Sequence, residues 1–356
     1  MFMRVLVTGG SGFIGSHVVD LLVADGHEVV SVDNLSPAAH AGVPDYLNPA
    51  AEHRVVPLGD LAGMISAATG TDAVCHQAAR VGLGVDFDDV TDYVNDNAAG
   101  TASLLKALYR TGFSGRLVQA SSMVVYGEGR YLCNNHGEVA PGPRRADDLA
   151  DGDFEPPCPT CGSSLAPTAV TESAPFDPRN VYAATKVHQE HLGAMFATAT
   201  SADVVSLRYH NVYGPRMPRD TPYAGVASIV RSACEAGSAP RVFEDGAQRR
   251  DFIHVDDVAA ANVLALTANS PIGGAYNIAS GQVCTIGEMA QAICDGFGAE
   301  APGPVVTGEY RTGDVRHVTA SPALARRVFG FAARIPYRTG LTSFAAAPMR
   351  SSPRRP

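Results

Sequence analysis

The chain has 356 residues, of which 46% are hydrophobic and 18% charged, and its formal net charge is −9. This composition is typical of a folded protein with one large or two modest domains, and it excludes an intrinsically disordered chain. The acidic balance argues against sequence-independent binding of nucleic acid, which needs a basic surface. No apolar run reaches the roughly 18 residues of a membrane span, and no signal peptide pattern precedes the first strand pattern, so we expect a cytoplasmic protein.

Short apolar runs alternate with helix-length segments through the N-terminal part of the chain. Several runs are rich in Val and lack strict alternation, as expected of parallel strands buried on both faces. Repeated βαβ units with right-handed crossovers predict an α/β fold with a Rossmann-type doubly wound parallel sheet. The predicted strands are Arg4–Thr8, Glu28–Asp33, Arg54–Leu58, Ala73–His76, Arg116–Ser121 and Val204–Tyr209, and the predicted helices include Ile14–Ala24, Asn97–Arg110 and Val181–Thr198.

The pattern changes after Gly214-Pro215, where Pro and Gly become frequent and the alternation loosens. We therefore expect a smaller C-terminal α/β domain, with the ligand crevice between it and the N-terminal domain. One later strand candidate, Ala275–Ala279, returns to the first sheet. The expected division is 1–214 with 251–283 for the dinucleotide-binding domain, 127–178 for an insert, 215–250 with 284–346 for the substrate domain, and 347–356, with the basic cluster Arg350 to Arg355, for a flexible tail.

A glycine-rich turn follows the first predicted strand and opens a helix. Gly9, Gly12 and Gly15 have the spacing that lets a backbone turn tightly, approach a pyrophosphate and pack helix on strand, with free N–H groups at the helix N-terminus. Such glycines alone also mark plain turns.

An acidic residue at the end of the second strand strengthens this interpretation. Asp33 lies about 20 residues after the glycines, where a carboxylate binds the adenosine ribose hydroxyls. Its charge would repel a 2′-phosphate, so we expect NAD and not NADP. The alternative is that Asp33-Asn34 is only a strand-ending turn. Asp60-Leu61, after the third strand, is a candidate adenine contact or, alternatively, a simple strand-to-loop Asp.

Three side chains form a candidate proton-transfer site. Tyr182 and Lys186 are four apart on a predicted helix and therefore share one face. A nearby ammonium favours the phenolate, so we expect Lys186 to lower the pKa of Tyr182. Ser122 follows the fifth strand, at the sheet edge where chemistry occurs in such folds, and can hold the reacting oxygen. A Tyr–Lys pair is common on helices, but the three elements in this order are specific.

With these motifs the chain resembles the NAD-dependent nucleotide-sugar epimerase/dehydratase family of extended short-chain dehydrogenases. The segments that carry the resemblance span roughly residues 5 to 320, and their joint occurrence is specific. They are TGGSGFIGSH, His76 to Ala79, Asn97 to Thr101, SSMVVYG, YAATK, Leu207 to Arg216 and Arg250 to Asp257.

The resemblance implies roles for particular residues. Ser122, Tyr182 and Lys186 match the catalytic triad, and guanidinium groups at Arg250 and Arg311 match those that grip the substrate diphosphate. Each of these two arginines could alternatively form a surface ion pair. The implied NAD contacts are Gly9, Gly12, Phe13, Ile14, Gly15, Asp33, Asn34, Asp60, Leu61, Gln77, Ala78, Ala79, Asn97, Ser121, Tyr182, Lys186, Tyr209 and His210, and the implied substrate contacts are Arg80, Ser122, Met123, Tyr182, Asn211, Arg250 and Arg311.

The implied reaction is 4-epimerisation of a nucleotide-diphosphate hexose through a 4-keto sugar, with NAD tightly bound. Two departures from the family bear on this. Met123 and Val124 stand where the family's dehydratases carry an Asp-Glu pair and its decarboxylases a Glu, so proton transfer for those reactions is disfavoured. His210 stands where the family usually carries Phe, and it either alters the nicotinamide environment or is a satisfied near-core histidine.

Other outcomes remain open. A dehydratase, decarboxylase or reductase of the same family is one alternative, and a non-catalytic NAD-sensing protein is another, since fold does not fix function. Neither the sugar nor its carrier, UDP or dTDP, can be deduced. The family's dimers pair through two helices that would include Asn97–Arg110 and Val181–Thr198, so a homodimer is expected.

The predicted insert holds three of the seven cysteines. Cys133 with His136, and Cys158 with Cys161, form two short pairs about 20 residues apart, which fits a structural Cys₃His zinc site. Unliganded loop thiols are the alternative. The other cysteines, Cys75, Cys234, Cys284 and Cys294, lie among apolar residues and are expected to be buried thiols, and the acidic residues around the insert argue against a nucleic-acid-binding ribbon.

Overall fold

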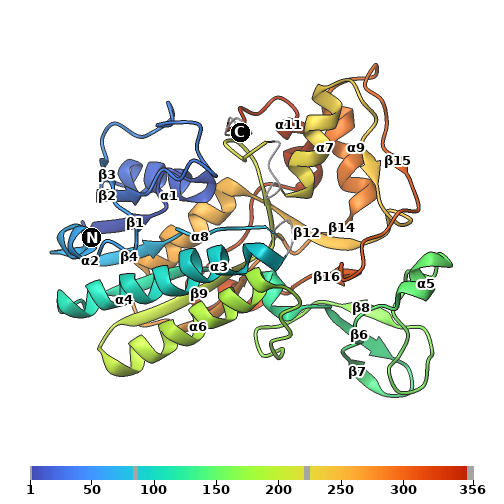
Figure 1. Cartoon of the computed structure of the whole chain (residues 1–356), viewed down its shortest axis with the longest axis horizontal. Coiled ribbons are helices and arrows are strands. Elements are labelled where there is room, and N and C mark those ends of the chain that lie inside the picture. The colour runs from blue at the N-terminus through green and yellow to red at the C-terminus, as the bar shows by residue number, and fades with distance from the viewer. Residues whose placement is uncertain (1, 83–86, 220–224, 351–356) are drawn as a thin grey trace.

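A seven-stranded parallel sheet lies at the centre of the protein (Figure 1). The computed structural model describes residues 2–82, 87–219 and 225–350. The strand order β13-β9-β5-β4-β1-β2-β3 reverses direction between β1 and β4, as in doubly wound folds, which confirms the predicted fold class. The strands are β1 Arg4–Thr8, β2 Glu28–Asp33, β3 Glu52–Val55, β4 Ala73–His76, β5 Arg116–Ser122, β9 Asp203–Tyr209 and β13 Gly274–Ile278.

Helices cover both faces of the sheet. Val5 and Val7 of β1 belong to the core on one face and Leu6 to the core on the other, because successive side chains of a strand point to opposite faces. This explains why the strands are apolar without alternation. The first face carries α1 Phe13–Ala24, α8 Val255–Thr267 and α10 Ala323–Phe329, and the second carries α2 Leu61–Ala68, α4 Gly100–Arg110 and α6 Val181–Ala199.

Two predicted boundaries were wrong. The third strand occupies Glu52–Val55 and ends before Pro57, which has no N–H to donate to a sheet. The helix predicted from Asn97 begins earlier, because α3, Val90–Tyr93, leads into a π-helical segment, Val94–Ala99, before α4.

The C-terminal part of the chain builds a third apolar core beside the sheet. Phe252, Met289 and Leu341 are buried together there. Its elements are β10 Asn211–Tyr213, α7 Val226–Glu235, β11 Arg241–Val242, β12 Arg249–His254, β14 Val283–Thr285, α9 Ile286–Gly296, β15 Val305–Val306, β16 His317–Val318 and α11 Tyr337–Phe344. The domain boundaries themselves stay a prediction.

The predicted insert forms a small three-stranded sheet that projects from the body (Figure 1). Its elements are β6 Arg130–Cys133, β7 Gly137–Val139, α5 Ala146–Ala150 and β8 Ala166–Thr168. It joins β5 through a 3₁₀ turn at Met123–Tyr126.

The start of the expected flexible tail is held in place. Ala347 and Met349 pack against the C-terminal core, and the N–H of Arg350 donates to the Met217 carbonyl at 3.1 Å. The rest of the expected tail, residues 351–356, lies outside the described residues. Within the described ranges, no helix is both long and apolar enough to cross a membrane.

Candidate active site and metal centre

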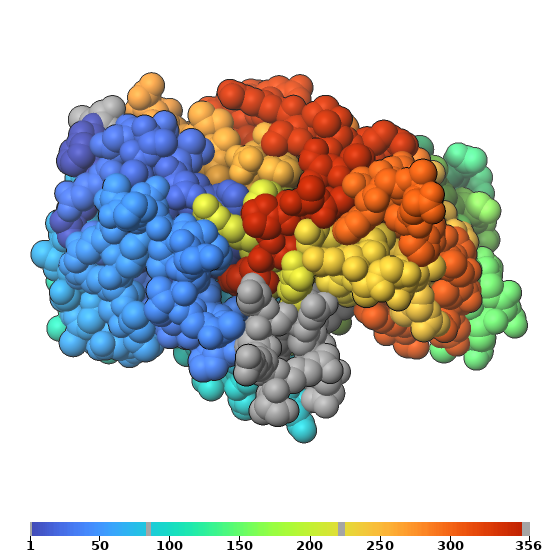
Figure 2. Space-filling model, turned by 90° about the horizontal axis from the view of Figure 1, so that it is seen from above, coloured from blue at the N-terminus to red at the C-terminus, as the bar shows by residue number. Residues whose placement is uncertain are grey.

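A cleft of about 1490 Å³ runs along the carboxyl ends of the parallel strands and is also lined by the C-terminal part of the chain. In Figure 2 the N-terminal part, in blue, and the C-terminal part, in yellow to red, lie side by side on this face. The cleft reaches from the glycine-rich turn to Arg250 and Arg311, so it spans both expected binding regions.

The glycine-rich turn forms one end of the cleft. Gly9 has a φ of +68°, and a side chain there would place its Cβ 2.6 Å from the backbone nitrogen of Ala78. A side chain at Gly15 would collide with the Gly9 carbonyl, so that glycine allows helix α1 to pack on β1. No side chain caps the N-terminus of α1, and Gly12, Phe13 and Ile14 at this end of the helix line the cleft.

Asp33 closes this end of the cleft at the tip of β2. Its carboxylate accepts hydrogen bonds from the N–H groups of Ser11 and Leu35, and His40 Nε2 lies 3.6 Å from it. Burial raises the pKa of Asp33, but His40 and the backbone N–H groups outweigh it, and the net pKa is lowered. The carboxylate is thus ionised, as a ribose-binding acid requires. The contact with His40 was not found from sequence, because the two residues are separated by an irregular loop.

The three predicted catalytic residues all line the cleft. Ser122 ends β5, where its hydroxyl accepts a 3.4 Å hydrogen bond from the Val124 N–H. Asn180 caps helix α6 by accepting from the Ala183 N–H at 2.8 Å, which places Tyr182 in the first turn. Lys186 Nζ lies 5.7 Å from the centre of the Tyr182 ring and donates to the Ala120 carbonyl at 2.8 Å.

The expected lowering of the Tyr182 pKa was wrong. Burial raises the pKa of Tyr182 to about 12, and the hydrogen bond with Ser122 only partly opposes it. Burial also lowers the pKa of Lys186 to about 7, against the attraction of Glu190. Because Lys186 is itself desolvated, it is a weaker source of positive charge than the sequence suggested.

A buried polar cluster forms the back of the cleft behind these residues. Gln77 Nε2 donates to Tyr209 Oη and to Asn262 Oδ1, both at 3.0 Å, and Tyr209 Oη donates to Asn262 Oδ1 at 2.9 Å. Asn262 comes from α8 and was missed from sequence, since its helix carries no motif.

His210 and Asn211 follow Tyr209 and also line the cleft. Neither ring nitrogen of His210 has a protein partner among the described residues, nor has Asn211 Oδ1. Burial lowers the pKa of His210 to about 3, with a smaller effect of Arg250, so its ring is neutral. The alternative of a satisfied near-core histidine does not fit this arrangement, because these groups are left for a ligand to pair.

The candidate diphosphate-binding arginines lie at the other end of the cleft. Arg250 donates to the carbonyls of Val315 at 2.7 Å and Arg316 at 2.9 Å. Arg311 is exposed and its guanidinium stacks 5.0 Å from the Phe243 ring centre. Among the described residues, neither arginine forms an ion pair with a carboxylate within 4.0 Å, so its charge is available to bind an anion.

Two further predicted substrate contacts, Arg80 and Met123, also line the cleft. Arg80 forms ion pairs with Asp92 of α3 and with Asp96 of the π-helical segment. Of the predicted NAD contacts, Asn34, Ala78, Ala79 and Ser121 line the cleft as well.

Three predicted NAD contacts do not line the cleft. Asp60 caps helix α2 by accepting from the Gly63 N–H at 3.1 Å, and Leu61 starts that helix. Asn97 is fully buried, where it bonds the backbone of Arg80 and donates to Thr185 Oγ1 at 3.0 Å. Asn97 therefore joins the cleft wall to helix α6.

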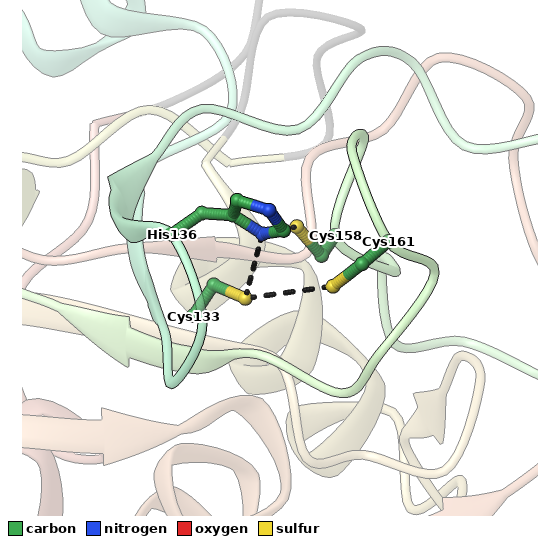
Figure 3. A group of neighbouring side chains, drawn as sticks. All are labelled: Cys133, His136, Cys158 and Cys161. Carbon is green, nitrogen blue, oxygen red and sulfur yellow. Dashed lines mark hydrogen bonds between the residues drawn. The ribbon is translucent and has the colours of Figure 1, made fainter.

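The four predicted metal ligands converge in the insert, as Figure 3 shows. Cys133 Sγ lies 3.8 Å from Cys161 Sγ and 3.5 Å from His136 Nδ1, and Cys158 Sγ lies 3.6 Å from the same nitrogen. All four ligand atoms lie within 4.8 Å of one another. Glycines at 137 and 162, with φ of +71° and +70°, form the tight turns beside the two ligand pairs.

Comparison with known proteins agrees with this site. The model of the NAD dependent epimerase/dehydratase family matches residues 5–147 and 159–279, so part of the insert is unmatched. The chain is 33% identical to a dTDP-L-rhamnose 4-epimerase of Burkholderia thailandensis, over 88% of this chain and 86% of that protein. It is 30% identical to a UDP-glucose 4-epimerase of Mycolicibacterium smegmatis, over 95% of this chain and 96% of that protein.

Solved structures show the same architecture. The UDP-glucose 4-epimerase of Thermus thermophilus, in complex with NAD, superposes with a TM-score of 0.77 at 29% identity, covering 97% of this chain and 98% of that chain. A UDP-N-acetylglucosamine 4-epimerase from Methanobrevibacter ruminantium, in complex with UDP-N-acetylmuramic acid, also gives 0.77 at 28% identity, covering 97% of each chain.

Proposed function

Because the chain belongs to the NAD dependent epimerase/dehydratase family, we propose that it is a nucleotide-sugar 4-epimerase with tightly bound NAD. The observation that carries the proposal is the cleft, which brings Ser122, Tyr182 and Lys186 between an NAD-type glycine turn and two cleft-lining arginines. Relatives named as 4-epimerases of UDP- and dTDP-linked sugars support the substrate class, a UDP- or dTDP-hexose.

The residues at the glycine-rich end of the cleft fit NAD. The turn at Gly9 requires glycine, because a Cβ there would collide with the backbone of Ala78, and the uncapped start of α1 offers N–H groups to a pyrophosphate. The ionised Asp33 suits ribose hydroxyls and repels a 2′-phosphate. When bound there, NAD would supply the hydride transfer at C4 of the sugar.

The chain's own residues handle the proton and the orientation. Tyr182 removes the proton of the sugar 4-hydroxyl and returns it to the same oxygen after the sugar has turned, while Ser122 orients that oxygen. Lys186, with a pKa of about 7, is partly protonated near neutral pH, and its charge favours the phenolate. Arg250 and Arg311 anchor the diphosphate while the sugar turns as a 4-keto intermediate.

The side chains beside Ser122 favour epimerisation over the other outcomes. Met123 and Val124 line the cleft at that point and cannot transfer a proton, so elimination of water lacks its acid and base. The intact Ser122, Tyr182 and Lys186 likewise disfavour a non-catalytic NAD sensor.

A substrate panel tests the proposal. The purified protein is incubated without added cofactor with UDP- and dTDP-linked hexoses, and the C4 configuration is followed by proton NMR. We expect one or more sugars to reach equilibrium with their 4-epimers. Accumulation of a 4-keto, dehydrated or reduced sugar would show that the protein catalyses another reaction of the family and is not a 4-epimerase. No conversion with NAD supplied would contradict the enzymatic assignment for this panel.

We further propose that Cys133, His136, Cys158 and Cys161 bind one structural zinc ion. Around tetrahedral zinc with Zn–S near 2.3 Å and Zn–N near 2.05 Å, two sulfurs lie about 3.8 Å apart and a sulfur and a nitrogen about 3.5 Å apart. The Cys133–Cys161, Cys133–His136 and Cys158–His136 distances of 3.8, 3.5 and 3.6 Å are close to these values, and all four ligand atoms lie within 4.8 Å of one another. A closed set of four protein ligands leaves no position for substrate, which makes the role structural.

Metal analysis tests the zinc proposal. Inductively coupled plasma mass spectrometry of the purified protein should find about one zinc per chain. Cys161→Ser should lose it, whereas Thr160→Ala, an exposed neighbour in the same turn, should keep it. If the wild-type protein contains no metal after expression with zinc, the zinc proposal is wrong and the cysteines are unliganded loop thiols.

Two further expectations belong to this proposal. A homodimer would pair through α4 and α6, and the exposed Tyr109 and Met195 on these helices support such a face. Light scattering of the purified protein should give twice the chain mass. A cytoplasmic location is proposed with it, and cell fractionation with an antibody checks that expectation.

A further inference from the structure

The metal-binding insert touches the substrate end of the cleft through a buried network of charges. On the insert side the network contains Arg144 and Glu155, and on the C-terminal side it contains Glu244 and Arg316. The side chains of Arg144, Glu244 and Arg316 are at most 4% exposed. Charges this buried are costly unless paired, so the network holds the two parts in one arrangement.

Glu244 is the point where the network reaches the cleft. It lines the cleft, and its φ of +54° is unusual for a residue other than glycine. Its carboxylate accepts from Arg144 at 2.7 Å and from Arg316 at 2.8 Å. Its neighbour Phe243 stacks on Arg311, so the two buried guanidinium groups fix the backbone that supports this arginine.

Arg144 and Arg316 also hold Arg250 and the loop that starts at Arg311. Arg144 also donates to the Asp314 carbonyl at 2.8 Å, within the loop that starts at Arg311. Glu155 accepts from Arg316 Nε at 2.9 Å, and the Arg316 carbonyl in turn accepts from Arg250. Both cleft arginines therefore rest on residues that the insert holds.

A metal in the insert would control this support through loop closure. Arg144 and Glu155 both lie between His136 and Cys158, in the loop that the four ligands close. The loop has few apolar residues of its own, of which Leu149 is buried, so without the cross-link its ordering would cost conformational entropy.

We propose that the insert is a positioning module for the nucleoside-diphosphate end of the substrate, in which the metal-closed loop sets Arg144 and Glu155 against Glu244 and Arg316 and thereby fixes Arg250 and Arg311. Arg144 and Glu155 are positioning residues, since they act through other groups. The inference rests on the proposed function for its ligand, a nucleoside diphosphate. It predicts that the insert affects the affinity for substrate but not the rate of the chemical step.

The test compares Arg144→Met with Arg145→Met. The adjacent Arg145 is 74% exposed and, among the described residues, its ion-pair partners are the surface carboxylates Asp147 and Asp148, so its variant is a matched control. Binding of UDP and dTDP is measured by calorimetry, and KM, kcat and NAD content are measured on the same samples. We expect Arg144→Met to raise the Kd for the nucleotide and the KM for the sugar about tenfold, equal to about 1.4 kcal/mol, with kcat and NAD content unchanged.

Two more variants test whether the weaker nucleotide binding depends on the metal: Cys161→Ser and the double variant Cys161→Ser/Arg144→Met. We expect Cys161→Ser to weaken nucleotide binding to a similar extent, and the double variant to be no worse than either single one, because both act through one loop. Glu155→Gln, at a half-exposed carboxylate, replaces Arg144→Met if that variant fails to fold.

Each result decides between the two proposals. Wild-type nucleotide affinity in Arg144→Met or Cys161→Ser overturns the positioning role and leaves the proposed function intact. A fall in kcat or in NAD content without a change in Kd also overturns it. If the wild-type protein binds neither UDP nor dTDP, both this inference and the proposed function fail.

Discussion

The NAD-binding end of the cleft and the insert are stabilised by different means. Strands β1 and β4 place Val5, Leu6 and Val74 in two large apolar cores, whereas the insert buries few apolar side chains, among them Tyr131 and Leu149. The first region is therefore held by hydrophobic burial, and the second by buried charges together with the metal cross-link proposed above. Changes at one region should consequently leave the other region's function or stability unaffected.

The largest expected effect is at the chemical centre between the two regions. Tyr182→Phe removes the proton-transfer hydroxyl, and general acid–base catalysis contributes about 10²- to 10⁴-fold, so we expect kcat to fall by about 10³-fold. NAD content and nucleotide affinity should stay at the wild-type level. Turnover by NMR and cofactor release after denaturation measure both. Tyr109→Phe, at an exposed tyrosine on α4, is the control, and a fully active Tyr182→Phe would contradict the mechanism.

The sequence predicted those features that depend on neighbouring residues. The Gly9 turn, the end of β2 at Asp33 and the i, i+4 pair of Tyr182 and Lys186 each lie within one element or its boundary, and all line the cleft. The Cys and His pairs were recognisable from spacing alone and converge as predicted, although whether a metal binds them stays a prediction.

Features that depend on tertiary environment could not be predicted. The pKa of Tyr182 depends on how deeply the site is buried, which Lys186 four residues away does not reveal. Asp60 resembled a cofactor contact but caps α2, because an Asp after a strand also starts helices. The pairing of Arg144 with Glu244 joins residues 100 positions apart that carry no motif.

The next effect tests whether the insert depends on a cross-link. We expect Cys161→Ser, or removal of metal by a chelator, to open the segment between β6 and β8 to proteases, since few buried apolar contacts would hold it. The melting temperature of the NAD-binding core should change by only a few degrees, about what 1 kcal/mol does in a domain of this size. Limited proteolysis with mass spectrometry locates the cuts, and Thr160→Ala is the control. An insert that stays resistant without metal would show that the charge network suffices.

A smaller effect is expected at the other end of the cleft. Asp33→Asn removes the charge that faces the ribose, and a hydrogen bond to a charged group contributes about 1.5–3 kcal/mol, so NAD affinity should fall at least about tenfold. Affinity for UDP or dTDP should not change, because that site is held from the insert side. Calorimetry on cofactor-stripped protein measures both ligands. Asp45→Asn, at an exposed carboxylate outside the cleft lining, is the control. Equal losses for both ligands would mean that the two ends are coupled.

The smallest effect is a change in how stability depends on pH. Burial lowers the pKa of His210 and of His76 to about 3, while an unfolded histidine titrates near 6.5. Between these values the unfolded chain binds more protons than the folded one, so the free energy of unfolding decreases as pH falls from about 6.5 towards 3. His210→Phe removes the contribution of His210, and its urea midpoint should fall less between pH 7.5 and pH 5 than that of the wild type. His188→Gln, at an exposed histidine on α6, is the control variant. A His210→Phe variant with the same pH dependence as the wild type would mean that His210 becomes protonated without loss of the fold, and the buried neutral ring assigned to the cleft would then be wrong.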